Sequence, residues 1–166
     1  MQVQENTLGV GSQMYGRAAG VRVVKPLQFD ADTPQTPGMR RLAAVSHALV
    51  GSERLWAGVM IAEPGVASAV HHHGDQETVV FVLSGRSKVR WGSRLEQEAE
   101  LEAGDFLFIP ARMPHQEINP SADQSVVWVV MRSAQEAVAV NLTPGPDGEY
   151  REANGLPPAA VAGPPH

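Results

Sequence analysis

The feature that most constrains this fold is a series of short apolar segments that recur about every 8–12 residues, with glycine or proline between them. Such spacing is typical of antiparallel sandwiches and barrels. No long stretch repeats with the 3.6-residue period of a helix, which argues against alternating strands and helices. The sequence therefore predicts an all-β antiparallel fold, with its clearest strands at residues 55–62, 78–83, 106–109, 125–131 and 137–142.

The two ends of the 166-residue chain differ from this pattern. Residues 1–20 contain glycine and show weak patterning, so we expect an irregular N-terminal arm. Residues 144–166 are dense in proline and glycine and have little apolar surface to bury, which indicates a flexible tail. We therefore divide the chain into an arm with edge strands at 1–50, a barrel at 51–143 and a tail at 144–166.

Composition excludes several classes of protein. The net charge of −5 argues against nucleic acid or an anionic membrane surface as the main partner. The chain has no cysteine, so disulfides and thiolate metal sites are excluded. No apolar run reaches the roughly 18 residues of a membrane span. The N-terminus lacks the basic and apolar regions of an export signal, so we expect a cytoplasmic protein.

A run of three histidines is the strongest chemical signal. Along a strand, His71 and His73 share one face and His72 takes the other. The chain then turns at Gly74 and Asp75, which places Glu77 near the same pocket, and His115 follows a distant proline. Three imidazoles and a carboxylate suit one divalent transition metal, such as Fe, Mn, Ni, Cu or Zn. The predicted ligands are His71, His73, Glu77 and His115.

The spacing of these residues resembles the two motifs of the cupin family. The first motif is matched by Gly65, His71, His73, Glu77 and Gly85, and the second by Gly104, Pro110, Arg112 in a glycine place, His115 and Asn119. The resemblance covers residues 55–142. It implies a jelly-roll barrel, also called a double-stranded β-helix, with a metal inside one end. It also implies a small-molecule substrate and a homodimer.

The first motif leaves the fourth ligand open. Counted back from Gly85, the family's glutamate place falls on Thr78, one residue after Glu77. A shift of one residue moves a side chain to the other face of a strand. A bulge could return Glu77 to the pocket. Without a bulge, Gln76 has the parity of Thr78 and could supply the oxygen, or the site could consist of three histidines.

Four further residues are candidates for catalysis or substrate binding. Glu117 shares a face with His115 and could be a general base, an orienting partner of a ligand or a rim carboxylate in a salt bridge. Arg112 could hold a substrate carboxylate or phosphate through its forked guanidinium. Phe81 and Trp128 lie on predicted strands, where they would form core or the wall of a substrate cavity.

The resemblance leaves the reaction open, because cupins include dioxygenases, isomerases, decarboxylases, lyases, storage proteins and sugar-binding modules. We favour a metal-dependent enzyme of dioxygenase type that acts on a small oxygen-rich molecule. A metal-dependent isomerase or lyase acting on a sugar, a sugar phosphate or a hydroxy acid is the alternative, and it would need a base such as Glu117. A non-catalytic ligand-binding module is the second alternative.

Overall fold

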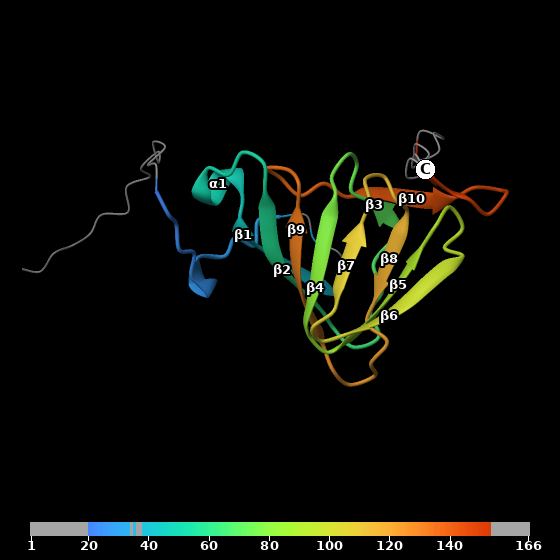
Figure 1. Cartoon of the computed structure of the whole chain (residues 1–166). Helices are drawn as coiled ribbons and strands as arrows, with labels where there is room; N and C mark the ends of the chain where they lie inside the picture. The colour runs from blue at the N-terminus through green and yellow to red at the C-terminus, as the bar shows by residue number, and fades with distance from the viewer. Residues whose placement is uncertain (1–19, 34, 36–37, 154–166) are drawn as a thin grey trace, which may run out of the picture.

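The computed structural model describes residues 20–33, 35 and 38–153 (Figure 1). The predicted arm at residues 1–20 lies almost wholly outside this part of the chain, as do residues 154–166 of the predicted tail. The described residues form two packed antiparallel sheets, which confirms the all-β prediction. The helices in this part of the chain are short and comprise η1 (Pro26–Gln28) and α1 (His47–Val50). Neither helix is long and apolar enough to cross a membrane.

The first sheet has five strands in the order β1-β2-β9-β4-β7. Its strands are β1 (Met39–Val45), β2 (Trp56–Ala62), β9 (Val126–Arg132), β4 (Thr78–Ser84) and β7 (Phe106–Ile109). Buried and half-buried residues alternate along β2 and β9, as expected for strands with one face on the core. The core between the sheets includes Trp56, Val82 and Trp128.

The second sheet has six strands in the order β11-β10-β3-β8-β5-β6. Its strands are β11 (Tyr150–Glu152), β10 (Val140–Pro144), β3 (His71–His72), β8 (His115–Ile118), β5 (Arg86–Trp91) and β6 (Gln97–Glu102). The short strand β3 lies between β10 and β8, so the histidine triplet enters the middle of this sheet. The sheet thus brings the two histidine-bearing segments side by side.

The C-terminal part of the sheet corrects the predicted tail. The flexible tail was expected from residue 144, but β10 and β11 form a hairpin that continues to Glu152. Its glycines form the turn, where Gly148 has a φ of +82° and Gly145 N–H donates to Glu149 O at 2.7 Å. Leu142 is buried, and Glu152 bonds the buried His72 ring at 3.0 Å. Pairing with β3 therefore orders a segment that composition alone assigns to a tail.

Candidate metal centre

Four buried side chains converge inside the barrel: His71, His73, His115 and Glu117. Strands β3 and β8 pair with His71 directly opposite His115. Glu117 lies two residues beyond His115 and so takes the same face of β8. One ligand atom from each of the four residues lies within 4.8 Å of the others. The structure therefore confirms that the triplet and the distant histidine meet.

Hydrogen bonds fix how the three imidazoles are turned. Nδ1 of His71 lies 2.9 Å from Ala69 O, and Nδ1 of His115 lies 2.7 Å from Met113 O. Because a carbonyl oxygen only accepts, both Nδ1 atoms carry the hydrogen and both Nε2 atoms keep a lone pair. Nδ1 of His73 bonds the Thr78 hydroxyl at 2.7 Å. All three Nε2 atoms thus turn to one point, as in metal-binding histidines.

The distances within the cluster fit one ion. Nε2 of His71 and Nε2 of His73 are 3.1 Å apart. Two metal–nitrogen bonds of about 2.0–2.1 Å at ordinary coordination angles separate their nitrogens by about 2.8–3.4 Å. Nε2 of His115 is buried with no hydrogen-bond partner, and it lies 3.5 Å from Glu117 Oε1. A cation would satisfy this orphaned lone pair, and it would compete with the Arg132 guanidinium, whose Nη2 lies 3.0 Å from Nε2 of His73, for the lone pair of His73.

The protonation states also suit metal binding. Burial lowers the pKa of His71 to about 4, so this ring is neutral at pH 7. Burial and then the Arg132 charge hold the pKa of His73 well below its usual value. Burial alone would raise the pKa of Glu117, but the imidazoles of His71 and His115 outweigh burial and lower it. Neutral imidazoles and an ionised carboxylate are the forms that bind a metal.

The carboxylate of the cluster is Glu117 and not the predicted Glu77. Glu77 is exposed and precedes β4, so its side chain does not reach the cluster. The register shift in β4 lies between Val82 and Ser84, too far along the chain to turn Glu77 inward. The side chain facing the cluster from β4 is Thr78. The assignment of Glu77 is therefore corrected.

The alternative ligand Gln76 is also engaged elsewhere. Its amide nitrogen donates to Glu136 O at 2.7 Å, and its amide oxygen accepts from Val138 N–H at 3.3 Å. These bonds fix the loop that leads into β10. The structure therefore gives Gln76 a structural role outside the cluster.

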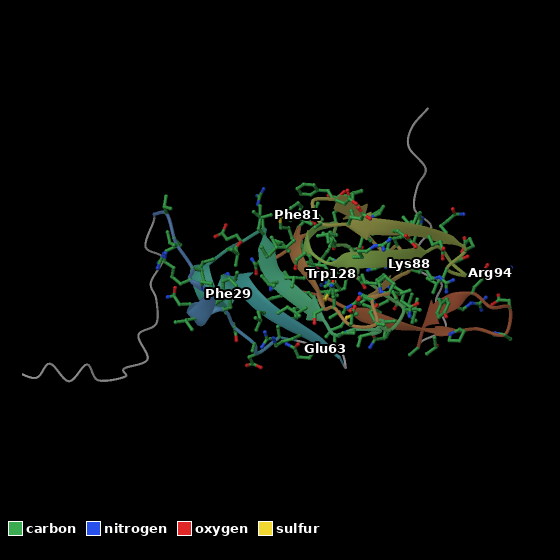
Figure 2. The ribbon with its side chains drawn as sticks, turned by 90° about the horizontal axis from the view of Figure 1, so that it is seen from below. Phe29, Glu63, Phe81, Lys88, Arg94 and Trp128 are labelled. Carbon is green, nitrogen blue, oxygen red and sulfur yellow. The ribbon has the colours of Figure 1, made fainter. Side chains whose placement is uncertain are left out.

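The predicted substrate-binding residues do not gather at the cluster. Arg112 has a φ of +59°, which explains why its place suits glycine, and its Nε donates to Asp75 Oδ1 at 2.7 Å on the surface. Phe81 is on the outer face of β4, with its ring centroid 4.7 Å from that of Phe106. Trp128 is inside the barrel core (Figure 2). None of these three residues lines the pocket beside His115, and their predicted substrate contacts stay predictions.

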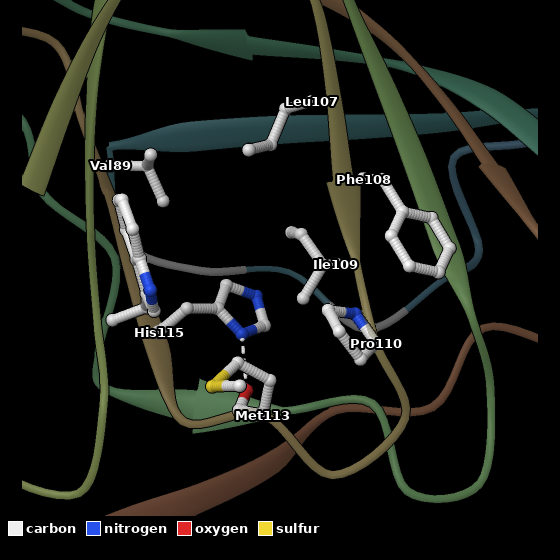
Figure 3. A pocket seen from close by; sticks show the side chains of 8 residues that line it. Val89, Leu107, Phe108, Ile109, Pro110, Met113 and His115 are labelled. Atoms are coloured by element: carbon white, nitrogen blue, oxygen red, sulfur yellow. Dashed lines mark hydrogen bonds between the residues drawn. The ribbon is translucent and has the colours of Figure 1, made fainter. Parts of the chain in front are cut away.

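A pocket of about 230 Å³ opens onto His115 (Figure 3). His115 is the one ionisable side chain in a mostly apolar wall, which consists of Val89, Trp91, Leu107, Phe108, Ile109, Pro110, Met113 and His115. The sequence analysis did not assign Trp91 or Met113 to the site. Alternation along β5 was the available signal, because it places Val89 and Trp91 on one face. The pocket is thus an apolar cavity that adjoins one residue of the cluster.

Comparison with known proteins agrees with this architecture. The family model described as "Cupin domain" matches residues 58–132. The polyketide cyclase RemF from Streptomyces resistomycificus is similar in structure, with a TM-score of 0.60, 19% identity and coverage of 78% of this chain and 89% of that chain. The protein TT1209 from Thermus thermophilus has a TM-score of 0.52 and 29% identity over 67% of this chain and 96% of that chain. Comparison with curated proteins gives no match.

Larger proteins share the same barrel. Oxalate decarboxylase from Bacillus subtilis matches with a TM-score of 0.58 and 20% identity over 64% of this chain and 28% of that chain. The chain likewise spans about a third of hazelnut vicilin, with 36% of that chain covered. These likenesses concern the fold. Together with the family match over residues 58–132, they show that this chain has the cupin fold, a double-stranded β-helix.

Proposed function

We propose that this cupin is a metal-dependent enzyme of dioxygenase type that acts on a small oxygen-rich molecule. The observation that carries the proposal is the convergence of three Nε2 lone pairs and one carboxylate in a buried site beside an apolar pocket. Two of the three imidazoles have their Nδ1–H held by a backbone carbonyl, so the site is arranged before any ligand arrives. Such preorganisation is typical of metal centres.

His71, His73, His115 and Glu117 would hold the ion. A bound Fe, Mn, Ni or Cu ion would supply Lewis-acid and redox chemistry for the reaction of an oxygen-rich substrate with O2. The pocket walls from β5 and β7 are mostly apolar, and a surrounding of low polarity strengthens electrostatic interactions. The Ser68 hydroxyl donates to Glu117 Oε2 at 3.0 Å and so orients the carboxylate.

The position of Glu117 favours oxygen chemistry over isomerisation. Isomerase or lyase chemistry on a sugar or hydroxy acid needs a base to move a proton. Glu117 is the only buried carboxylate among the described residues, and it belongs to the cluster. A carboxylate that binds the ion is unavailable as a free base. Chemistry that needs no protein carboxylate as base therefore fits this interior best.

Metal reconstitution followed by oxygen uptake tests the proposal. The protein is loaded separately with Fe(II), Mn(II), Ni(II) or Cu(II), its metal content is measured, and oxygen consumption is followed with diketones, catechols and thiols. We expect about one ion per chain and oxygen uptake with at least one metal form. His115→Ala should lose the ion, whereas His47→Ala, at an exposed position, should keep it. Metal binding without oxygen uptake, combined with anaerobic turnover of sugar phosphates, would contradict dioxygenase chemistry.

The predicted partners and location stay predictions. The small-molecule substrate follows from the pocket, and the homodimer and cytoplasmic location follow from the sequence analysis. Size-exclusion chromatography with light scattering would measure the number of chains in the particle. A mass of one chain would contradict the predicted homodimer.

A further inference from the structure

Two buried guanidinium groups lie in the barrel with the candidate metal centre. Arg41 projects inward from β1 and is 7% exposed, and Arg132 projects inward from β9 and is 3% exposed. The Arg132 guanidinium carbon lies 5.7 Å from the centre of the Trp56 ring. Arginine is rarely buried unless an anion pairs with it. The buried charge of Arg132 therefore needs an explanation.

The hydrogen bonds of Arg132 are incomplete. One terminal nitrogen, Nη1, donates to Val138 O at 2.6 Å, and the other, Nη2, lies 3.0 Å from Nε2 of His73. Its Nε is buried with no hydrogen-bond partner. Among the described residues, no carboxylate lies within ion-pair distance of Arg132. A buried N–H group without an acceptor is costly, so Arg132 has donor capacity for a ligand.

Metal binding would increase that capacity. The lone pair on Nε2 of His73, which faces Arg132, is the one that an ion would take. With a metal–nitrogen bond of about 2.1 Å, the Nη2 atom would lie within about 5 Å of the ion. That span is bridged by one ligand oxygen that binds the ion and accepts from the guanidinium.

The buried charges point to the sign of the ligand. Among the described residues, the buried arginine and carboxylate side chains are Arg41, Arg132 and Glu117. Glu117 belongs to the cluster, and a divalent ion bound there would add two positive charges close to the Arg132 guanidinium. A buried guanidinium beside a buried cation favours an anion that both can bind. A carboxylate matches the planar fork of arginine.

We propose that the ligand of this site is a carboxylate-bearing molecule, with one oxygen on the metal, a hydrogen bond from Arg132 and an apolar remainder in the pocket beside His115. This inference rests on the proposed metal centre and specifies its substrate class. Arg132 is here a substrate-binding residue. The apolar walls formed by Trp91, Met113 and their neighbours would receive the part of the molecule that carries no charge.

Titration of the Co(II) protein tests this inference without relying on turnover. The visible absorption bands of Co(II) report a change in its ligands when benzoate, benzamide, acetate or phosphate is added. We expect benzoate to bind at least tenfold more tightly than its neutral analogue benzamide, and more tightly than acetate. Equal binding of benzoate and benzamide, or no spectral change with benzoate, would overturn the proposal. Tighter binding of phosphate than of benzoate would overturn the assignment of a carboxylate.

Matched variants assign the charge to Arg132. Arg132→Met should weaken benzoate binding about 10- to 100-fold while Co(II) stays bound. The benzoate affinity of Arg132→Lys should lie between those of the wild type and Arg132→Met. Arg90→Met, at an exposed arginine paired with Glu98, is the control and should bind benzoate like the wild type. Unchanged benzoate affinity in Arg132→Met would overturn the role of this residue. If the Arg132 variants do not fold, the wild-type comparison of benzoate with benzamide still decides the proposal.

The outcomes separate this inference from the proposed function. A protein that takes up no Co(II), Zn(II), Fe(II), Mn(II), Ni(II) or Cu(II) would overturn both. A protein that takes up Co(II) but shows no preference for benzoate would overturn the carboxylate proposal alone. Carboxylate binding without oxygen uptake in any metal form would leave the carboxylate proposal standing and contradict the dioxygenase.

Discussion

Replacing Thr78 by valine tests how the metal centre is held in place. The Thr78 side chain is fully buried, and its hydroxyl lies 2.7 Å from Nδ1 of His73. Valine keeps nearly the same shape but removes the hydroxyl. The His73 ring would then lose the bond that fixes its orientation. The variant therefore isolates one hydrogen bond from the packing around it.

The expected magnitudes follow from that single bond. An N–H group left buried without a partner costs about 1–3 kcal/mol, which in a domain of this size lowers the melting temperature by about 2–12 °C. Loss of a residue that orients a ligand histidine lowers metal affinity about 10- to 100-fold. That loss corresponds to about 1.4–2.7 kcal/mol, so the two effects have the same scale.

Chelator competition with Zn(II) measures the affinity, and calorimetry of the metal-free protein measures the stability. Thr143→Val, at an exposed position on β10, is the matched control and should leave both quantities unchanged. Thr78→Ser should retain most of the affinity because it keeps the hydroxyl. The reasoning is refuted if Thr78→Val binds Zn(II) as tightly as the wild type.

Three further predictions concern the cluster and the fold. Glu117→Gln should lower metal affinity at least about tenfold, whereas Glu77→Gln, at an exposed position, should leave metal affinity unchanged. Equilibrium dialysis measures both affinities. A larger loss in Glu77→Gln than in Glu117→Gln would show that Glu77 is the ligand. Asn119→Ala should lower the free energy of unfolding, measured by urea denaturation, by about 2–4 kcal/mol, because the Asn119 amide donates to Ala62 O, Glu63 O and Gln124 O. A loss below about 1 kcal/mol would contradict this structural role of Asn119. Because burial lowers the pKa of His71 from 6.5 to about 4, the unfolded chain binds a proton over this range that the folded chain does not. The free energy of unfolding of the metal-free protein should thus have its full value above pH 6.5 and be about 2 kcal/mol lower at pH 5. Equal free energies of unfolding at pH 7 and pH 5 would contradict the pKa shift of His71.

Features of the sequence that depend on local alternation were predictable. Short apolar runs bounded by glycine and proline located the strands, and alternation along a strand placed His71 and His73 on one face. The meeting of these residues with His115 was predictable from the two spaced motifs. Asn119 was expected to bond the backbone, and its amide does so.

Features that depend on where a strand begins, or on which strand it meets, were not predictable. Glu77 and Thr78 are adjacent, and only the start of β4 at Thr78 decides which of them faces inward. The hairpin of β10 and β11 forms because β3 offers it an edge, which no local composition reveals. Glu117 was recognised as sharing the face of His115, but its place in the cluster became visible only with the Nε2 positions.

The residue at position 78 connects the metal centre with the proposed carboxylate site. Thr78 and Arg132 are directly opposite in the pairing of β4 with β9, and both contact the His73 ring. A glutamate at position 78, the place that it takes in the cupin motif, would therefore stand beside the Arg132 guanidinium and could pair with it. In this chain the carboxylate comes from Glu117 on β8, and Nε of Arg132 keeps no partner.

Thr78→Glu should consequently fill the proposed substrate position from within the protein. We expect this variant to keep its metal, because the four residues of the cluster remain and a glutamate oxygen can accept from Nδ1 of His73 in place of the Thr78 hydroxyl. It should lose benzoate binding by at least about tenfold, because Arg132 would already be paired. Co(II) absorption measures both quantities in one titration, and circular dichroism checks the fold. Undiminished benzoate binding in a folded, metal-loaded Thr78→Glu protein would show that the guanidinium and the inward side chain of β4 do not share one site.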